Sequence, residues 1–216
     1  MRYFAIERST ERDALVEAVL PLVAFQGWTM QSARAAAPEA GLDPRDVALL
    51  FPAGPAELVE VFCDLADRRM ADAAASMDFS GQRAPQRVHA VIAARLEALR
   101  PHKEAVRRAL GLLALPIHAA AAARTAARTA SAIWYAAGDS AVGFDWYTKR
   151  ATLAAVYGAT LLAWLADPSD DDRATLAFLD RRLADAGRMG GVRRRIEERL
   201  SRLRRQGGAG PEAAHG

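Results

Sequence analysis

Apolar residues recur at helical spacing along most of the chain, and glycine, proline and polar clusters separate the recurrences. In the first segment the apolar positions lie three or four residues apart, which is the spacing of one helix face. No segment alternates apolar and polar residues as a half-buried strand does. The pattern therefore predicts an all-α protein of about nine or ten helices. The expected helices span Thr10–Phe25, Gln31–Ala40, Pro44–Leu50, Ala56–Ser76, Pro85–Leu99, Pro101–Leu113, Pro116–Ala137, Phe144–Leu165, Asp170–Met189 and Val192–Gln206.

Two short helices near the N-terminus are joined by a tight turn. Gly41 is a normal C-terminal stop for the first of them, and Asp43-Pro44 supplies an N-cap and a first helical proline for the second. Phe51-Pro52 closes the second helix. Because a longer helix precedes the pair, the segment is typical of a helix-turn-helix unit.

This N-terminal arrangement resembles that of the TetR regulators. The similar spacing is carried by Ala14-Leu15, Gly27-Trp28, Ala40-Gly41-Leu42 and Phe51-Pro52. The resemblance implies a TetR-regulator-like fold, in which the helix-turn-helix unit is followed by a larger helical ligand-binding domain. It also implies operator DNA in the major groove.

The charge of the N-terminal unit disagrees with a DNA-binding role. Residues 1–65 hold five arginines against ten acidic residues, whereas a protein that contacts phosphates needs positive charge to replace counterions. The expected recognition helix offers only Arg45, flanked by Asp43 and Asp46. It lacks the tyrosine and lysine that regulators of this fold place against the DNA backbone. The sequence therefore indicates that the fold is kept and that the DNA-binding function is lost.

Composition bounds the class of protein. Of the 216 residues, 51% are apolar and 25% are charged, so the chain can build a buried core. Alanine occupies 50 positions, which favours helices. The single cysteine, Cys63, excludes an internal disulfide and a multi-cysteine zinc site. The longest uncharged run, Ala151–Ala166, is shorter than the ~20 residues of a spanning helix, and no secretory signal is apparent, so we expect a soluble intracellular protein.

Catalytic signatures are weak. The segment Gly138–Gly143 is similar to a nucleophile elbow, but its second glycine falls one residue late and no strand precedes it, which favours a helix–helix turn. The four histidines lack metal-ligand spacing, and no Glu-x-x-His motif of a helical di-iron site occurs. His118 marks either a pocket or a hydrogen-bonded core position. We therefore expect no enzymatic activity, metal or cofactor.

Residues 133–158 contain two Trp-Tyr pairs around a turn. The motifs run Ile133-Trp134-Tyr135-Ala136-Ala137-Gly138-Asp139, Asp145-Trp146-Tyr147-Thr148-Lys149-Arg150 and Leu153-Ala154-Ala155-Val156-Tyr157-Gly158. They closely resemble the ubiquinone-biosynthesis accessory protein family (Coq-nine). The similarity extends from about Arg12 to Gly190 and includes Asp67-Arg68-Arg69-Met70 and Phe178-Leu179-Asp180-Arg181-Arg182. Asp145 departs from the asparagine that is common there.

The family resemblance implies a non-catalytic, TetR-like homodimer that binds lipid in place of an effector. It implies that the protein presents a polyprenyl quinone intermediate to a di-iron demethoxyubiquinone hydroxylase, with Trp146 and Tyr147 on the surface that contacts the hydroxylase. From the residues alone, this aromatic pair suits either an interface or a core edge. The alanine and arginine content indicates a bacterial member without organelle targeting. For such a member the resemblance implies a cytoplasmic protein that is peripherally attached to the inner membrane. The alternative is a TetR-type transcriptional regulator with a lipid ligand.

Helices that are apolar around most of their circumference offer a place for the lipid. Such helices either line an apolar cavity or pack tightly through their alanines, and the sequence leaves both possibilities open. A third possibility is a scaffold without ligand. The candidate lipid-binding residues are Leu112, Leu115, Ile117, His118, Ile133, Trp134, Leu153, Val156, Tyr157, Leu161 and Trp164.

The C-terminal segment combines a narrow apolar stripe with many arginines. Residues 181–216 hold ten arginines against four acidic residues. This composition is typical of a helix that lies in a membrane interface, although a solvated helix packed on its own domain and a nucleic-acid contact are alternatives. The candidate membrane-binding residues are Arg193, Arg194, Arg195, Ile196, Arg199, Leu200 and Leu203.

Four regions are therefore expected along the chain. Residues 1–53 form the helix-turn-helix-like unit, and residues 54–189 form the helical lipid-binding and dimerisation domain. Residues 190–206 form the basic amphipathic membrane helix, and residues 207–216 form a disordered tail.

Overall fold

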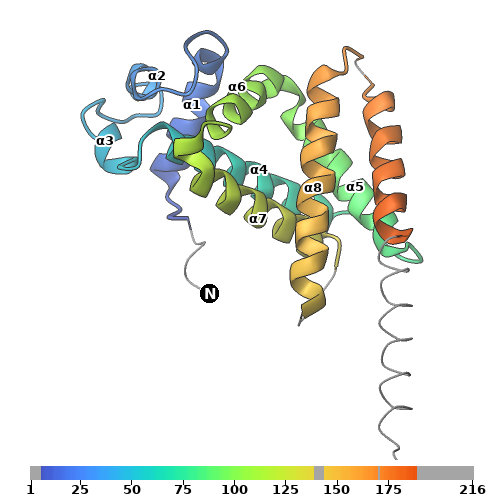
Figure 1. Cartoon of the computed structure of the whole chain (residues 1–216). Helices are drawn as coiled ribbons and strands as arrows, with labels where there is room; N and C mark the ends of the chain where they lie inside the picture. The colour runs from blue at the N-terminus through green and yellow to red at the C-terminus, as the bar shows by residue number, and fades with distance from the viewer. Residues whose placement is uncertain (1–5, 139–143, 170, 189–216) are drawn as a thin grey trace, which may run out of the picture.

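The computed structural model describes residues 6–138, 144–169 and 171–188, with side chains described from residue 149 onward in the second range. Throughout this part of the chain the backbone forms helices and turns and no strand, which confirms the all-α prediction (Figure 1). The helices are α1 (Thr10–Gln26), α2 (Met30–Ala36), α3 (Val47–Leu50), α4 (Pro55–Ala75), α5 (Ala84–Leu99), α6 (Lys103–Leu113), α7 (Ala119–Ala136) and α8 (Phe144–Ala166), with 3-10 turns η1 (Arg100–His102) and η2 (Pro116–His118). A further helix spans 173–188.

Helix α4 lies at the centre of the bundle. It packs against α7, α5 and α1, while α8 packs against α7, and α1 packs against α2 and α6. Figure 1 shows α1, α2 and α3 gathered at one end of the molecule, with α8 and the helix 173–188 at the other. One continuous apolar core joins the two ends, from Leu15 and Val19 on α1 through Leu58 on α4 to Trp164 on α8. The N-terminal unit is therefore part of the same core as the larger helical region.

The ends of the first helices follow the sequence signals closely. Gly27 ends α1 with a φ of 73°, a left-handed conformation that glycine adopts without strain, and its N–H donates to Val23 O at 2.9 Å. The second helix ends at Ala36, earlier than the expected Ala40. The reason is Pro38, which has no N–H to bond to the carbonyl of Arg34 and so cannot continue the helix.

The third helix is also shorter than expected. It begins at Val47, because residues 43–46 form a turn in which Asp46 N donates to Asp43 O at 3.0 Å. The Asp43 side chain caps this turn by accepting from Arg45 N at 2.8 Å. Asp43 and Pro44 thus begin a turn that leads into the helix, and the helix itself is one turn long.

No single helix in the described ranges has both the length and the apolar character required to cross a bilayer. The segments Ala84–Leu113 and Pro116–Ala136 pass that test only as a pair, and they are bent by 95° where they meet.

Trp28 connects the N-terminal unit to the larger bundle. Its indole Nε1–H donates to the Ala105 carbonyl of α6 at 2.9 Å, and its ring lies 5.1 Å from that of Phe62 on α4. We predict that Trp28→Phe lowers the free energy of unfolding by about 2 kcal/mol, because it removes a buried hydrogen bond and apolar contact. Urea denaturation measures the loss.

The matched control is Phe25→Leu near the end of α1, three residues before Trp28, where the side chain is 86% exposed. This control is expected to stay within about 0.5 kcal/mol of the wild type. If the two variants are equally stable, the Trp28 hydrogen bond does not hold the N-terminal unit in place.

Candidate functional site

Four carboxylates project from one side of α4, and each forms an ion pair with an arginine. They are Glu57, Glu60, Asp64 and Asp67, spaced three or four residues apart. Three of them are buried, and a buried charge without a partner is costly. Their arginine partners are Arg12 for Glu57, Arg124 and Arg128 for Glu60, Arg8 and Arg68 for Asp64, and Arg95 for Asp67.

Within this row, Asp64 accepts hydrogen bonds from Arg8 Nη2 at 2.7 Å and from Arg68 Nε at 3.0 Å. Burial acts to raise the pKa of Asp64, but the hydrogen bonds and charges of these two arginines outweigh it and lower the pKa. Asp64 is therefore held as a carboxylate by its partners.

At the deep end of the row, Asp67 pairs with Arg95 of α5. Arg95 Nη2 lies 2.9 Å from Asp67 Oδ1, and Thr129 of α7 donates its hydroxyl to Asp67 Oδ2 at 3.0 Å. The guanidinium carbon of Arg95 lies 5.5 Å from the ring centroid of Tyr157 on α8. Burial raises the pKa of Asp67 above its usual value although Arg95 opposes the shift. Four helices, α4, α5, α7 and α8, thus meet at one buried polar cluster.

Cys63 lies one turn before Asp67 on α4 and is half-buried. Burial raises the pKa of its thiol to about 12, so the group stays protonated near neutral pH. This protonation state suits a neutral packing or weak hydrogen-bonding role and makes a nucleophilic role unfavourable.

The candidate lipid-binding residues separate into three sets. Ile133, Leu153, Val156, Tyr157, Leu161 and Trp164 are buried in the core. Leu112, His118 and Trp134 are half-buried. Leu115 and Ile117 lie on the connection between α6 and α7, where they are 47% and 82% exposed, apart from the buried set. The structure thus brings six of the eleven together around α7 and α8, and their contact with a lipid stays a prediction.

The first Trp-Tyr pair packs against the Lys-Arg pair that follows the second. Trp134 Nε1 donates to Lys149 O at 3.3 Å, and Lys149 Nζ lies 5.8 Å from the Trp134 ring centroid. Arg150 Cζ lies 5.2 Å from the ring centroid of Tyr135, a second cation–π contact. These contacts join the end of α7 to the first turns of α8, so this part of the motif has a structural role.

The predicted partner-binding and membrane-binding residues are not located by the structure. Trp146 and Tyr147 lie in α8, but their side chains fall outside the described residues. The same applies to residues 189–216, which include the predicted basic helix and tail.

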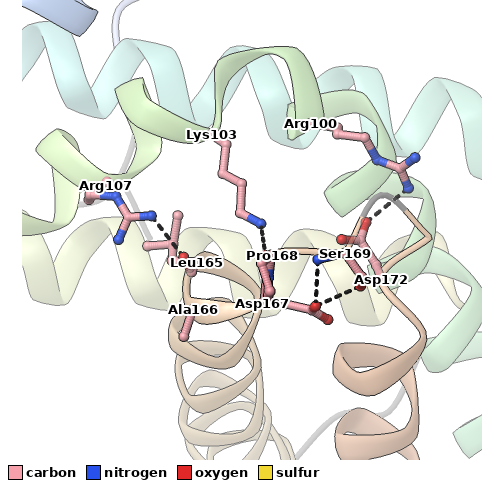
Figure 2. Close-up of a pocket in the computed structure, with 9 residues that line it drawn as sticks. All are labelled: Arg100, Lys103, Arg107, Leu165, Ala166, Asp167, Pro168, Ser169 and Asp172. Carbon is pink, nitrogen blue, oxygen red and sulfur yellow. Dashed lines mark hydrogen bonds and ion pairs between the residues drawn. The ribbon is translucent and has the colours of Figure 1, made fainter.

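A surface pocket of about 470 Å³, which the sequence did not predict, lies between α6 and the end of α8 (Figure 2). Lys103 Nζ donates to Asp167 O at 2.5 Å, and Arg107 Nη2 donates to Leu165 O at 2.8 Å. These cations thus bind the last carbonyls of α8, where the helix dipole favours positive charge. The basic residues of the pocket therefore stabilise the end of α8. In the sequence, the turn signal Asp167-Pro168-Ser169 predicted that a helix ends here but did not predict the pocket. Its lining residues are Arg100, Lys103, Arg107, Leu165, Ala166, Asp167, Pro168, Ser169 and Asp172.

On α3 and the turn before it, the surface that would face DNA carries little positive charge. The side chain of Arg45 is almost fully exposed and lies 3.8 Å from the Asp43 carboxylate. Leu49, on the helix itself, is 79% exposed. An acid-paired arginine beside an exposed leucine does not supply the phosphate contacts of a DNA-reading helix.

Metal ligands do not converge within residues 6–138, 144–169 and 171–188, where no three His, Cys, Asp or Glu side chains form a group able to hold a metal ion.

Comparison with known proteins finds one family. The model of the COQ9 family matches residues 119–190. "Ubiquinone biosynthesis protein COQ9, mitochondrial" of Homo sapiens is 30% identical over 190 residues, which cover 85% of this chain and 59% of that protein. The Drosophila melanogaster protein of the same description is 31% identical over 179 residues, covering 81% of this chain and 55% of that protein. The chain thus spans less than two thirds of the length of these relatives.

Among solved structures, the TetR transcriptional regulator from Nitrosomonas europaea ATCC 19718 is similar. It superposes with a TM-score of 0.65 at 27% identity, covering 83% of this chain and 99% of that one. This likeness confirms the TetR-regulator-like fold.

Asp167, at the edge of the pocket, makes the stability of the folded protein depend on pH. Its carboxylate accepts from the backbone and hydroxyl groups of Ser169 and Thr175, which lowers its pKa from the usual 3.8 to about 2. As the pH falls from about 4 to about 2, the unfolded chain binds this proton before the folded chain does, so stability is lost across that window. We predict that Asp167→Asn makes the free energy of unfolding fall less steeply over this range, as measured by urea denaturation at each pH.

The control is Asp171→Asn, a nearby exposed carboxylate that pairs with Arg173 at 2.9 Å. A wild-type slope in Asp167→Asn would show that the hydrogen bonds to Asp167 do not contribute to stability.

Proposed function

We propose that this chain, which is similar to COQ9 proteins and has a TetR-like fold, is a non-catalytic, lipid-binding accessory protein of ubiquinone biosynthesis. In this proposal it binds a polyprenyl quinone intermediate and presents it to the demethoxyubiquinone hydroxylase at a membrane. The observation that supports the proposal most directly is the alignment with COQ9 proteins over 85% of the chain. The aligned family model covers residues 119–190, which include α7, α8 and most of the candidate lipid-binding residues.

The core of the described region is compatible with a lipid tail. The buried side chains of α8 that face α7 are mostly apolar, and they include Leu153, Val156 and Leu161. Many of their neighbours are alanines, such as Ala130 and Ala154, which leave room between backbones when a chain enters. An isoprenoid tail requires an apolar environment of this kind.

We propose further that the protein is a homodimer. The outer face of α8 supports this, because Ala151, Ala155, Leu162 and Ala166 are exposed at intervals of four or seven residues and none is charged. Leu162 in particular leaves a large apolar side chain in water. If a second copy of the chain covers this face, its apolar side chains are removed from water.

Two further contacts complete the proposal, and both rest on the sequence. Trp146 and Tyr147 at the start of α8 would contact the di-iron hydroxylase, and the basic helix of residues 190–206 would lie on the anionic surface of the inner membrane. The adjoining Trp134 and Lys149 contacts support the first assignment, because they hold the start of α8 against α7 and so fix its position.

A transcriptional role is the less favoured function. The TetR fold is shared with regulators, but the acidic N-terminal unit and the acid-paired Arg45 provide little affinity for phosphates. Retarded migration of promoter DNA at moderate salt, surviving excess competitor, would reverse this preference.

The bound ligand tests the lipid-binding proposal. We predict that native mass spectrometry of the purified protein, followed by solvent extraction, finds about one isoprenoid quinone or other long-chain lipid per subunit. Val156→Trp, which fills the core beside α7, is expected to reduce the bound fraction because it occupies the space of the tail.

Leu49→Trp at an exposed position of α3 is the control and is expected to retain the lipid. A wild-type protein that stays empty after incubation with quinone-bearing vesicles would reject lipid binding and favour a scaffold that acts only through its surface.

The partner and membrane contacts are tested by two variants that act as controls for each other. Trp146→Ala with Tyr147→Ala is expected to abolish capture of the hydroxylase and leave binding to anionic vesicles unchanged, because it removes an aromatic contact only. Arg193→Glu, Arg194→Glu and Arg195→Glu together are expected to reduce co-sedimentation with the same vesicles, because each arginine contributes about 1 kcal/mol near an anionic surface. Unchanged capture in the first variant, or unchanged sedimentation in the second, would refute the corresponding assignment.

A further inference from the structure

Arg95 carries more hydrogen-bond donors than its surroundings use. Its side chain is 3% exposed, and its Nη2 pairs with Asp67 at 2.9 Å. Among the described residues, Arg95 alone has two buried side-chain nitrogen atoms, Nε and Nη1, without a hydrogen-bond partner. A buried N–H without an acceptor costs free energy, so a buried arginine of this kind is incompletely satisfied by the protein itself.

The groups around Arg95 come from three further helices. Tyr157 on α8 lies with its ring beside the guanidinium and accepts a hydrogen bond from Arg95 through its hydroxyl, and the Thr129 hydroxyl on α7 donates to the other oxygen of Asp67. Cys63, one turn before Asp67 on α4, is a partly exposed residue, so this part of α4 reaches the accessible surface. The charged pair therefore lies about one helical turn from the surface.

The charges of Arg95 and Asp67 limit which ligand groups can bind beside them. Asp67 and Arg95 form a neutral pair, and the Cys63 thiol remains uncharged because burial raises its pKa to about 12. An anionic group placed on Nε and Nη1 would lie close to the Asp67 carboxylate and would be repelled by it. A neutral acceptor, such as a carbonyl or ether oxygen, meets the donors without this penalty.

The surrounding surface is apolar. One turn to either side of Tyr157 on α8, Leu153 and Leu161 are buried, and the ring of Tyr157 itself offers a flat face. The polar region thus lies within an apolar environment, an arrangement in which a few placed polar groups orient a mostly apolar ligand.

We propose that Arg95, flanked by Tyr157 and Cys63, binds neutral oxygen atoms on the ring of an apolar ligand, as a quinone presents in its carbonyl and methoxy groups. This inference rests on the proposed lipid-binding function and adds which part of the ligand the core recognises and which head groups it rejects. A carboxylate or phosphate head on the same kind of tail is disfavoured at this site.

The experiment compares three probes on the full-length protein by native mass spectrometry and by titration of the intrinsic tryptophan fluorescence. The probes are a ubiquinone with two isoprene units, an isoprenoid hydrocarbon without oxygen, and oleate. The wild type is expected to bind the quinone at least about tenfold more tightly than either other probe, the scale of one or two hydrogen bonds in a buried site. Equal binding of all three probes would overturn head-group recognition and leave lipid binding standing. Binding of none of them would overturn both.

The variant Arg95→Lys keeps the positive charge beside Asp67 and removes the two unpartnered N–H groups. It is expected to lose about tenfold in quinone affinity while binding the hydrocarbon as the wild type does. Arg100→Lys is the matched control, because Arg100 also pairs with a buried aspartate, Asp172 at 2.9 Å, but in the surface pocket. A wild-type preference for the quinone in Arg95→Lys would refute the role of Arg95.

A second variant keeps the inference testable if Arg95→Lys does not fold, as judged by circular dichroism. Cys63→Leu changes no charge and fills the accessible space beside the ion pair. It is expected to weaken quinone binding more than hydrocarbon binding, because it excludes the ring from the polar region. Undiminished quinone binding in a folded Cys63→Leu variant would place the ring elsewhere.

Discussion

The buried carboxylates of α4 are the constraint on which the arrangement of the other helices depends. A charge inside a protein must be paired, since removing one partner leaves the other without compensation at a cost of about 3–5 kcal/mol. Here α7 brings Arg128 to Glu60 and α5 brings Arg95 to Asp67, while the buried Arg12 of α1 pairs with the half-buried Glu57. Apolar packing alone tolerates small rotations of a helix, but a buried ion pair does not. The pairs therefore fix how each helix faces α4.

The helices themselves could be predicted from the sequence because their signals are local. Apolar spacing and the residues that cap or break a helix lie within a few positions of the structure they determine. Gly27 shows this at the end of α1, where only a left-handed residue completes the turn. The two errors of length, in α2 and α3, also have a local cause. Both arise where a proline, Pro38 or Pro44, lies inside or at the start of a short segment and a turn competes with the helix.

The polar cluster could not be predicted in the same way, because its partners are distant in sequence. The motif that begins at Asp67 was visible, but nothing in it identifies Arg95, which lies on another helix 28 positions later, or Thr129 on a third. The spacing of charged residues on one helix predicts which face is polar. It does not predict which other helix packs against that face. The Trp134 and Lys149 contact is an intermediate case. Both residues belonged to a recognised motif, yet only the structure shows that they pack against each other.

The orientation of α7 changes what its alanine-rich sequence implies for a ligand. In the sequence this helix is apolar around most of its circumference, which is compatible with a tunnel wall. In the structure its buried positions include Thr125 and Thr129, which face the acidic side of α4, while Ala123 and Ala127 are exposed. The apolar character of α7 thus lies partly on the outside of the molecule. A ligand that lies against the α4 side of α7 therefore meets polar groups, so a hydrocarbon tail alone is a poor match for this part of the core. A molecule with an oxygen-bearing ring at one end and a hydrocarbon chain at the other matches both regions.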